Sequence, residues 1–149
     1  MLSGKLIRLI ESHEEEIGSR IIQDIRRDPG LAHLAGLPVA ELRERGQEIL
    51  QNLGHWLAFE NEEKIEHEYE DIGKLRYNEA IPLEESIRGL CAIKYRMIDF
   101  IHEEGLDRDC VALYAEEELE RRVARFFDTL VIHLVRGYEA EWRHTMAAV

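Results

Sequence analysis

The stretch RFFDTLVIHLV, residues 125–135, decides how this sequence is interpreted. Its composition is helical, and apolar residues point to nearly every side of such a helix, yet it contains Asp128 and His133. A surface helix has one apolar stripe, whereas a helix that is apolar all round is buried or covered on two sides. We therefore predict a helix with protein packed on two faces, in which Asp128 and His133 are semi-buried groups satisfied by hydrogen bonds.

The rest of the composition is that of one soluble domain. The 149 residues fit a single domain, 1–149, and 45% hydrophobic residues are enough to build a core. Lys and Arg number 19 against 31 Asp and Glu, a net charge of -12 that disfavours nucleic acid or an anionic membrane as partner. No apolar run reaches the length of a membrane span. An acidic N-terminus unlike a signal peptide, and two cysteines without a disulfide framework, predict a cytoplasmic protein.

Helical periodicity runs through most of the chain, and no segment shows sustained β-type alternation. Three prolines, Pro29, Pro38 and Pro82, separate the helical stretches. We expect an all-α domain of five to six helices. The predicted helices cover about 3–27, 38–59, 62–78, 82 to a break at 103–109, and a last region over 107–146, with a helical turn in the connector 31–38.

The last helical region would be about 60 Å long as one rod, at ~1.5 Å per residue. That is too long for a compact domain of this size, so we expect a bend near 114–118 and a long C-terminal helix from about Glu116. Within this helix, five residues are predicted to face the domain's own core: Leu119, Val123, Phe126, Leu130 and Leu134.

Three ionisable residues, Arg76, Lys94 and Asp128, occupy positions where the periodicity predicts apolar side chains. In one interpretation the two basic stems lie along the edge of the core with their charged heads in water. In the other, Asp128 pairs with Arg76 or Lys94 in a shielded contact, because an unpaired buried charge is costly. Both remain open, and these three residues together with Trp56 and His133 are the candidate ligand pocket.

A metal or haem site is the alternative use of the chain's histidines and acids. A di-iron bundle needs two Glu-x-x-His pairs, whereas Glu141 and His144 form the only one, near the C-terminus. The sequence has no His-x-x-x-His, zinc-type cysteine spacing, Gly-rich phosphate loop or Gly-x-Ser-x-Gly. A haem would need a proximal histidine facing an apolar pocket, for which His133 and His55 are the candidates. We favour ordinary roles for these residues, and expect no enzymatic activity, no metal and no cofactor.

One stretch resembles a known family. DIGKLRYNEAIPLEESIRGL, 71–90, is similar to the signature of the N-terminal sensory domain of the RsbR/RsbRD stress-regulator family. The shared pattern is a Gly-x-Leu-Arg step, a short stop, and a Pro-Leu-Glu-Glu helix start. Here it comprises Gly73, Leu75, Arg76, Ile81, Pro82, Leu83, Glu84 and Glu85. HWL at 55–57, FFD at 126–128 and Gly137-Tyr138 are also similar to that family.

The resemblance implies a non-enzymatic helical sensory module, related to non-haem globin-like domains, that precedes an output domain. That output is either an anti-sigma-factor antagonist domain or a histidine kinase, and the family offers no catalytic residues to carry over. Only eleven residues follow Tyr138, so we expect an excised sensory domain or a stand-alone relative. Signalling modules of this kind usually form dimers, and we expect a homodimer in which Phe127, Val131 and Val135 face the partner subunit or a second layer.

Overall fold

The computed structural model describes residues 2–57, 62–104 and 110–148, and every regular element within these ranges is helical. The described part has eight α-helices, where we predicted five to six. They are α1 (Leu2–Ser12), α2 (Glu14–Arg27), α3 (Ala32–Ala35), α4 (Val39–Gln51), α5 (Leu53–Trp56), α6 (Glu62–Asn78), α7 (Leu83–Glu104) and α8 (Cys110–Ala147), with a 3-10 turn at Pro29–Leu31. The predicted helix end at Phe59 and most of the predicted break at 103–109 lie outside the described residues. None of the described helices is long and apolar enough to cross a membrane.

Two of the additional helices arise where a side chain forms a hydrogen bond with a backbone carbonyl of the preceding turn and interrupts a predicted helix. His13 interrupts the predicted first helix: its Nδ1 lies 2.8 Å from the Leu9 carbonyl oxygen, and its backbone leaves the helical region at φ -106° and ψ 22°. Asn52 separates α4 from α5 in the same way, with its Nδ2 donating to the Glu48 carbonyl oxygen at 3.1 Å. Such local bonds compete with the helical ladder, and neither residue type is a strong breaker in a sequence pattern.

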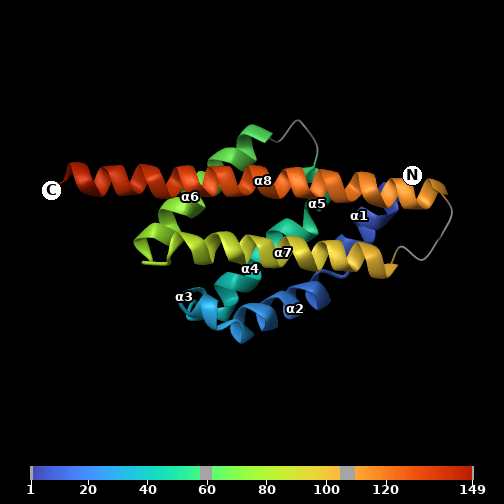
Figure 1. Ribbon diagram of the computed structural model, residues 1–149, viewed down its shortest axis with the longest axis horizontal. Helices are drawn as coiled ribbons and strands as arrows, with labels where there is room; N and C mark the ends of the chain where they lie inside the picture. Colours follow the sequence, from blue (N-terminus) through green and yellow to red (C-terminus); the bar gives the residue numbers. More distant parts are fainter. Residues whose placement is uncertain (1, 58–61, 105–109, 149) are drawn as a thin grey trace.

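The predicted bend in the last helical region is wrong. α8 runs unbroken for 38 residues, without proline and with Gly137 as its single glycine. Its C-terminal end projects beyond the rest of the molecule, at the left of Figure 1. The length limit that we drew from a compact domain therefore does not apply to this helix.

The prediction that α8 is covered on two sides is confirmed, with the chain's own helices as the cover. α7 runs alongside α8, α6 crosses it, and α1 packs near its N-terminal end (Figure 1). The five residues predicted to face the core are all buried. α2 and α4 pack against each other, and α2 also packs on α7, where the Arg96 guanidinium holds the Asp24 carboxylate through two contacts of 2.5 and 2.8 Å.

The crossing of α6 over α8 depends on two glycines. A Cβ built on Gly137 would lie 2.9 Å from the Cα of Gly73 and would also overlap the Glu70 carbonyl oxygen. A Cβ on Gly73 would meet the Leu134 carbonyl oxygen and lie 3.0 Å from the Cα of Gly137. The two backbones are thus in direct contact, and neither glycine has room for a side chain.

We predict that Gly73→Ala lowers the free energy of unfolding by about 1–3 kcal/mol, the usual cost of forcing atoms into a packed contact. Gly18→Ala is the matched control, because a Cβ on this helical glycine would meet nothing within 4 Å. The control is expected to gain up to ~1 kcal/mol from helix propensity. Urea denaturation followed by circular dichroism measures both; equal effects of the two variants would contradict the close crossing.

Candidate functional site

Three motif residues of 71–90, Gly73, Arg76 and Glu85, make contacts between helices. Arg76 follows Gly73 on α6 by one turn and is 5% exposed. Its Nη1 donates to Glu41 Oε1 on α4 at 2.7 Å and to Glu79 Oε1 at 2.9 Å. A buried charge needs such partners, so Arg76 joins α6 to α4 with its charge compensated.

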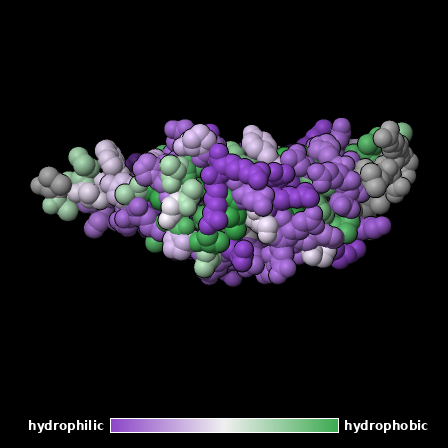
Figure 2. All heavy atoms as spheres, turned by 90° about the horizontal axis from the view of Figure 1, so that it is seen from below, coloured by the Kyte–Doolittle hydropathy of each residue, from purple (hydrophilic) through white to green (hydrophobic). Residues whose placement is uncertain are grey.

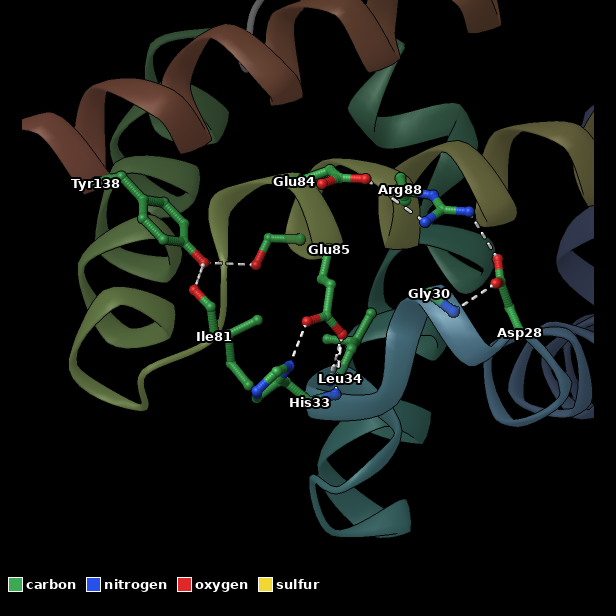
Figure 3. A network of polar contacts seen from close by, with 10 residues as sticks. Asp28, Gly30, His33, Leu34, Ile81, Glu84, Glu85, Arg88 and Tyr138 are labelled. Atoms are coloured by element: carbon green, nitrogen blue, oxygen red, sulfur yellow. Dashed lines mark hydrogen bonds and ion pairs between the residues drawn. The ribbon is translucent and has the colours of Figure 1, made fainter.

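A buried hydroxyl relay links α8 to the start of α7 (Figure 3). The Tyr138 hydroxyl donates to the Ile81 carbonyl oxygen at 2.9 Å and lies 2.6 Å from Ser86 Oγ, which is left to donate to it. Burial raises the pKa of Tyr138 above its usual value, against the lowering effect of the Ser86 hydrogen bond. Tyr138 directly follows Gly137, so the close crossing also places this hydroxyl.

Glu85 turns the other way and caps the short α3. Its Oε1 accepts hydrogen bonds from the backbone N–H groups of His33 at 2.9 Å and Leu34 at 3.2 Å, and its Oε2 lies 2.6 Å from His33 Nδ1 (Figure 3). Burial would raise the pKa of Glu85, but the hydrogen bonds from Leu34 and His33 outweigh it and hold the pKa below its usual value. The buried carboxylate therefore stays charged and ties α7 to α3.

An apolar cavity, which we call the chamber, lies between these contacts. Its walls come from α2, α3, α4, α6, α7 and α8 and are mostly aliphatic, with Ile21, Ile49 and Leu90 among them. The volume open to the centre of a water-sized sphere is about 70 Å³. Arg76, Ser86 and Tyr69 are polar members of the wall, and the exposed Arg43 stands at its edge. Ile72 and Leu134, which flank the helix crossing, also line it.

The lining of the chamber does not fit a haem. Haem iron takes an axial histidine, cysteine, methionine or tyrosine, and the described lining includes no histidine, cysteine or methionine. Tyr69 is the remaining ligand type. Burial, with the negative charges of Glu68 and Glu48, raises the pKa of Tyr69 well above its usual value, which disfavours the phenolate that would bind iron.

The structure does not bring the five predicted pocket residues together. Arg76 alone lines the chamber. Trp56 is half-buried on α5 and donates from Nε1 to the Glu48 carbonyl oxygen at 3.0 Å. Lys94 lies with its Nζ 5.0 Å from the centre of the exposed Tyr95 ring. Asp128 is exposed, so the interpretation in which it pairs with Arg76 or Lys94 in a shielded contact is wrong, and Arg76 pairs with Glu41 and Glu79.

His133 is buried and hydrogen-bonded as expected, but in the α6–α8 interface. Its Nδ1 lies 2.9 Å from Glu70 Oε2, and its Nε2 lies 3.5 Å from Glu66 Oε1. The two carboxylates contact opposite ring nitrogens of His133. This arrangement joins α6 to α8 and does not place the three side chains around one metal ion. No group of three potential ligands that could hold a metal occurs among the described residues.

The three residues predicted to face a partner differ in burial. Phe127 was predicted to face a partner subunit or a second layer; it is 1% exposed in the single chain and belongs to the core, which agrees with a second layer and not with a dimer interface. On a helix apolar all round, one position along the chain turns a side chain by about 100°, and the pattern could not fix the orientation. Val131 packs against the core from a half-buried position, and Val135 is also half-buried.

Sequence reasoning missed the features that shape the chamber. Gly18 and Gly46 both line it, and a Cβ on either would meet nothing within 4 Å. The available signal was a glycine in the middle of a helical pattern, which costs about 1 kcal/mol relative to alanine and so suggests a packing or functional reason.

We predict that Glu85→Gln lowers the free energy of unfolding at neutral pH by about 2 kcal/mol, because charged hydrogen bonds to three donors are lost or weakened. Since the folded pKa of Glu85 lies below its ordinary 4.5, its stabilisation is present above pH 4.5 and is lost as pH falls through the folded pKa. The difference between wild type and variant should therefore shrink on acidification. Thermal unfolding from pH 3 to pH 7 measures it, with Glu84→Gln, whose side chain is 79% exposed, as the near-neutral control.

Comparison with known proteins identifies the fold. No protein-family model matches the sequence, and no curated protein matches it either. The chain is similar to the solved globin domain of DosC from E. coli, form II in the ferrous state, with a TM-score of 0.73 and 12% sequence identity. The match covers 91% of this chain and 88% of that chain. At this identity the likeness shows the architecture alone: the chain has an all-helical, globin-like fold.

Proposed function

We propose that this chain is a non-enzymatic sensory or regulatory domain of a bacterial signalling pathway, passing a signal to an output domain through helix packing and dimerisation. The observation that carries the proposal is the use of the 71–90 motif. Gly73, Arg76 and Glu85 each hold one helix against another, and none stands in a cluster of reactive groups. A motif that fixes α6 against α8 and α4, and α7 against α3, suits a domain whose output is a change of helix packing.

The RsbR/RsbRD resemblance and the globin-like fold support the same proposal from two directions. The resemblance implies a helical sensor ahead of an anti-sigma-factor antagonist domain or a histidine kinase, and these are the output partners that we propose. The globin-like fold is the architecture expected from that resemblance. The narrower assignment to this family, and a cytoplasmic role in stress response, belong to the proposal.

The surface of α8 offers a face for the second copy. Ile132 is 52% exposed and Trp142 is 53% exposed, with Val135 between them in sequence and Met146 one turn beyond Trp142. These positions follow the three- and four-residue spacing of a helical stripe. We propose that this stripe, in place of Phe127, forms the dimer contact, because a two-fold interface pairs the same patch of both subunits.

A haem-binding globin is the second candidate, favoured by the ferrous DosC domain among similar structures. The donor types in the chamber wall oppose it. Adding haemin to the purified protein and recording the absorption spectrum separates the two proposals. We expect the spectrum of free haemin; a sharpened Soret band that is lost in Tyr69→Phe or His55→Ala would establish the haem protein and contradict a sensory domain that works without haem.

We predict that the protein elutes as a dimer of twice 17.4 kDa in size-exclusion chromatography with light scattering. Ile132→Arg should produce a monomer, since it places a charge in the apolar contact. Tyr95→Arg is the matched control, because Tyr95 is 58% exposed on α7 and lies outside the stripe. A monomeric wild type, or a dimer unaffected by Ile132→Arg, contradicts the proposed transmission through this face.

A further inference from the structure

A second hollow adjoins the chamber and differs from it in chemistry. This antechamber is lined by Glu14, Glu15, Gly18, Ser19, Arg43 and Gln47, and its volume, measured as for the chamber, is about 230 Å³. Gly18 and Arg43 line both hollows. The apolar chamber and the polar antechamber therefore meet between α2 and α4. Figure 2 shows the side of the molecule that carries α2 and α3, where hydrophilic side chains cover most of the surface and apolar atoms show between them.

The glycines at this junction act in the opposite way to those of the α6–α8 crossing. Gly73 and Gly137 bring two backbones into contact, whereas a Cβ on Gly18 or Gly46 would enter open space. Gly46 is buried on α4 all the same. An alanine at either position would favour the helix by about 1 kcal/mol. The small residues thus keep space open at a cost in helix stability, which is what a binding cavity requires.

The antechamber holds polar groups with unused hydrogen-bonding capacity. Glu14 Oε1 accepts from Gln51 Nε2 at 3.0 Å, but the buried Glu14 Oε2 has no partner among the described groups. A buried acceptor without a partner is costly. Arg43, at the junction, forms no ion pair within the described part of the chain. The Glu14 carboxylate and the Arg43 guanidinium therefore both belong to the wall of the antechamber, next to an aliphatic chamber.

We propose that the chamber and antechamber together bind a small amphiphile with a short aliphatic tail and an uncharged hydroxyl head. The tail lies in the chamber and the head in the antechamber, where a hydroxyl can donate to Glu14 and accept from Arg43. The inference deepens the proposed sensory function and rests on it for its role, because it names the chemistry of the signal.

Volume and charge restrict the ligand. An apolar cavity of about 150 Å³ holds the six carbons of benzene, and the chamber has about 70 Å³, so about three carbons fit in it beyond the carbon that carries the hydroxyl. Glu14 and Glu15 outnumber Arg43 in the antechamber, which disfavours a carboxylate head. An ammonium head could donate to Glu14 but has no acceptor for the Arg43 guanidinium, whereas a neutral hydroxyl can donate to the one and accept from the other.

Titration with 1-butanol, followed by isoleucine-methyl NMR of the full chain, tests this proposal. We expect saturable shifts of Ile21, Ile49 and Ile93, which line the chamber, and none of Ile10, which is buried elsewhere. Gly46→Leu should weaken binding at least tenfold by filling the chamber, and Gly46→Ala by a smaller factor. Gly4→Leu is the matched control, because it adds the same side chain to a helical glycine that does not line the chamber.

Each outcome decides one question. Unsaturable shifts, or equal affinities of Gly46→Leu and Gly4→Leu, overturn the site. Butyrate or butylamine binding more tightly than 1-butanol overturns the hydroxyl head. Light scattering on the same samples keeps the two proposals apart: a dimer that binds no 1-butanol refutes the ligand inference alone, and a monomer that binds it refutes the proposed transmission alone.

Discussion

The contact between Gly73 and Gly137 is the constraint on which the rest of the structure depends. Two helices whose backbones touch cannot slide past each other without a clash, so the register of α6 on α8 is fixed at one point. The neighbours of the two glycines are fixed with it. Arg76 reaches α4 one turn beyond Gly73, and Tyr138 reaches the Ile81 carbonyl and Ser86 directly after Gly137. The positions of α4, α7 and α8 therefore all depend on this one crossing.

Much of the helical architecture could be predicted from the sequence, because periodicity and proline positions carry it. α6 was predicted within its observed bounds, and the two-sided cover of α8 followed from residues 125–135 being apolar on nearly every side. The breaks at His13 and Asn52 could not be predicted, since each depends on a hydrogen bond between the side chain and the carbonyl four residues earlier. The periodicity of apolar residues carries no information about such a bond.

Most contacts of the candidate site could not be predicted from the sequence, for a different reason. Arg76 and Glu41 are far apart in the chain, as are Glu85 and His33, and no local pattern names such partners. Asp128 was predicted to be semi-buried because its neighbours are apolar, yet it is exposed on α8. The aliphatic chamber arises from three-dimensional packing. In the sequence, the feature that pointed to it was a pair of glycines within helical patterns.

The chamber and the helix crossing share walls, and this connects binding to the position of α8. Ile72 precedes Gly73, and the Leu134 carbonyl is the group that a Cβ on Gly73 would strike; both side chains line the chamber. Arg76 lines it as well and carries the ion pairs to α4. Because packed interiors transmit strain, an occupant of the chamber bears on the same residues that set the crossing. A ligand could then shift the equilibrium between two packings of α8 only by the difference in its affinity for them. The exposed stripe of α8 at Ile132 lies two residues before Leu134, so the element that would sense the occupant is also the one that we propose contacts the second subunit.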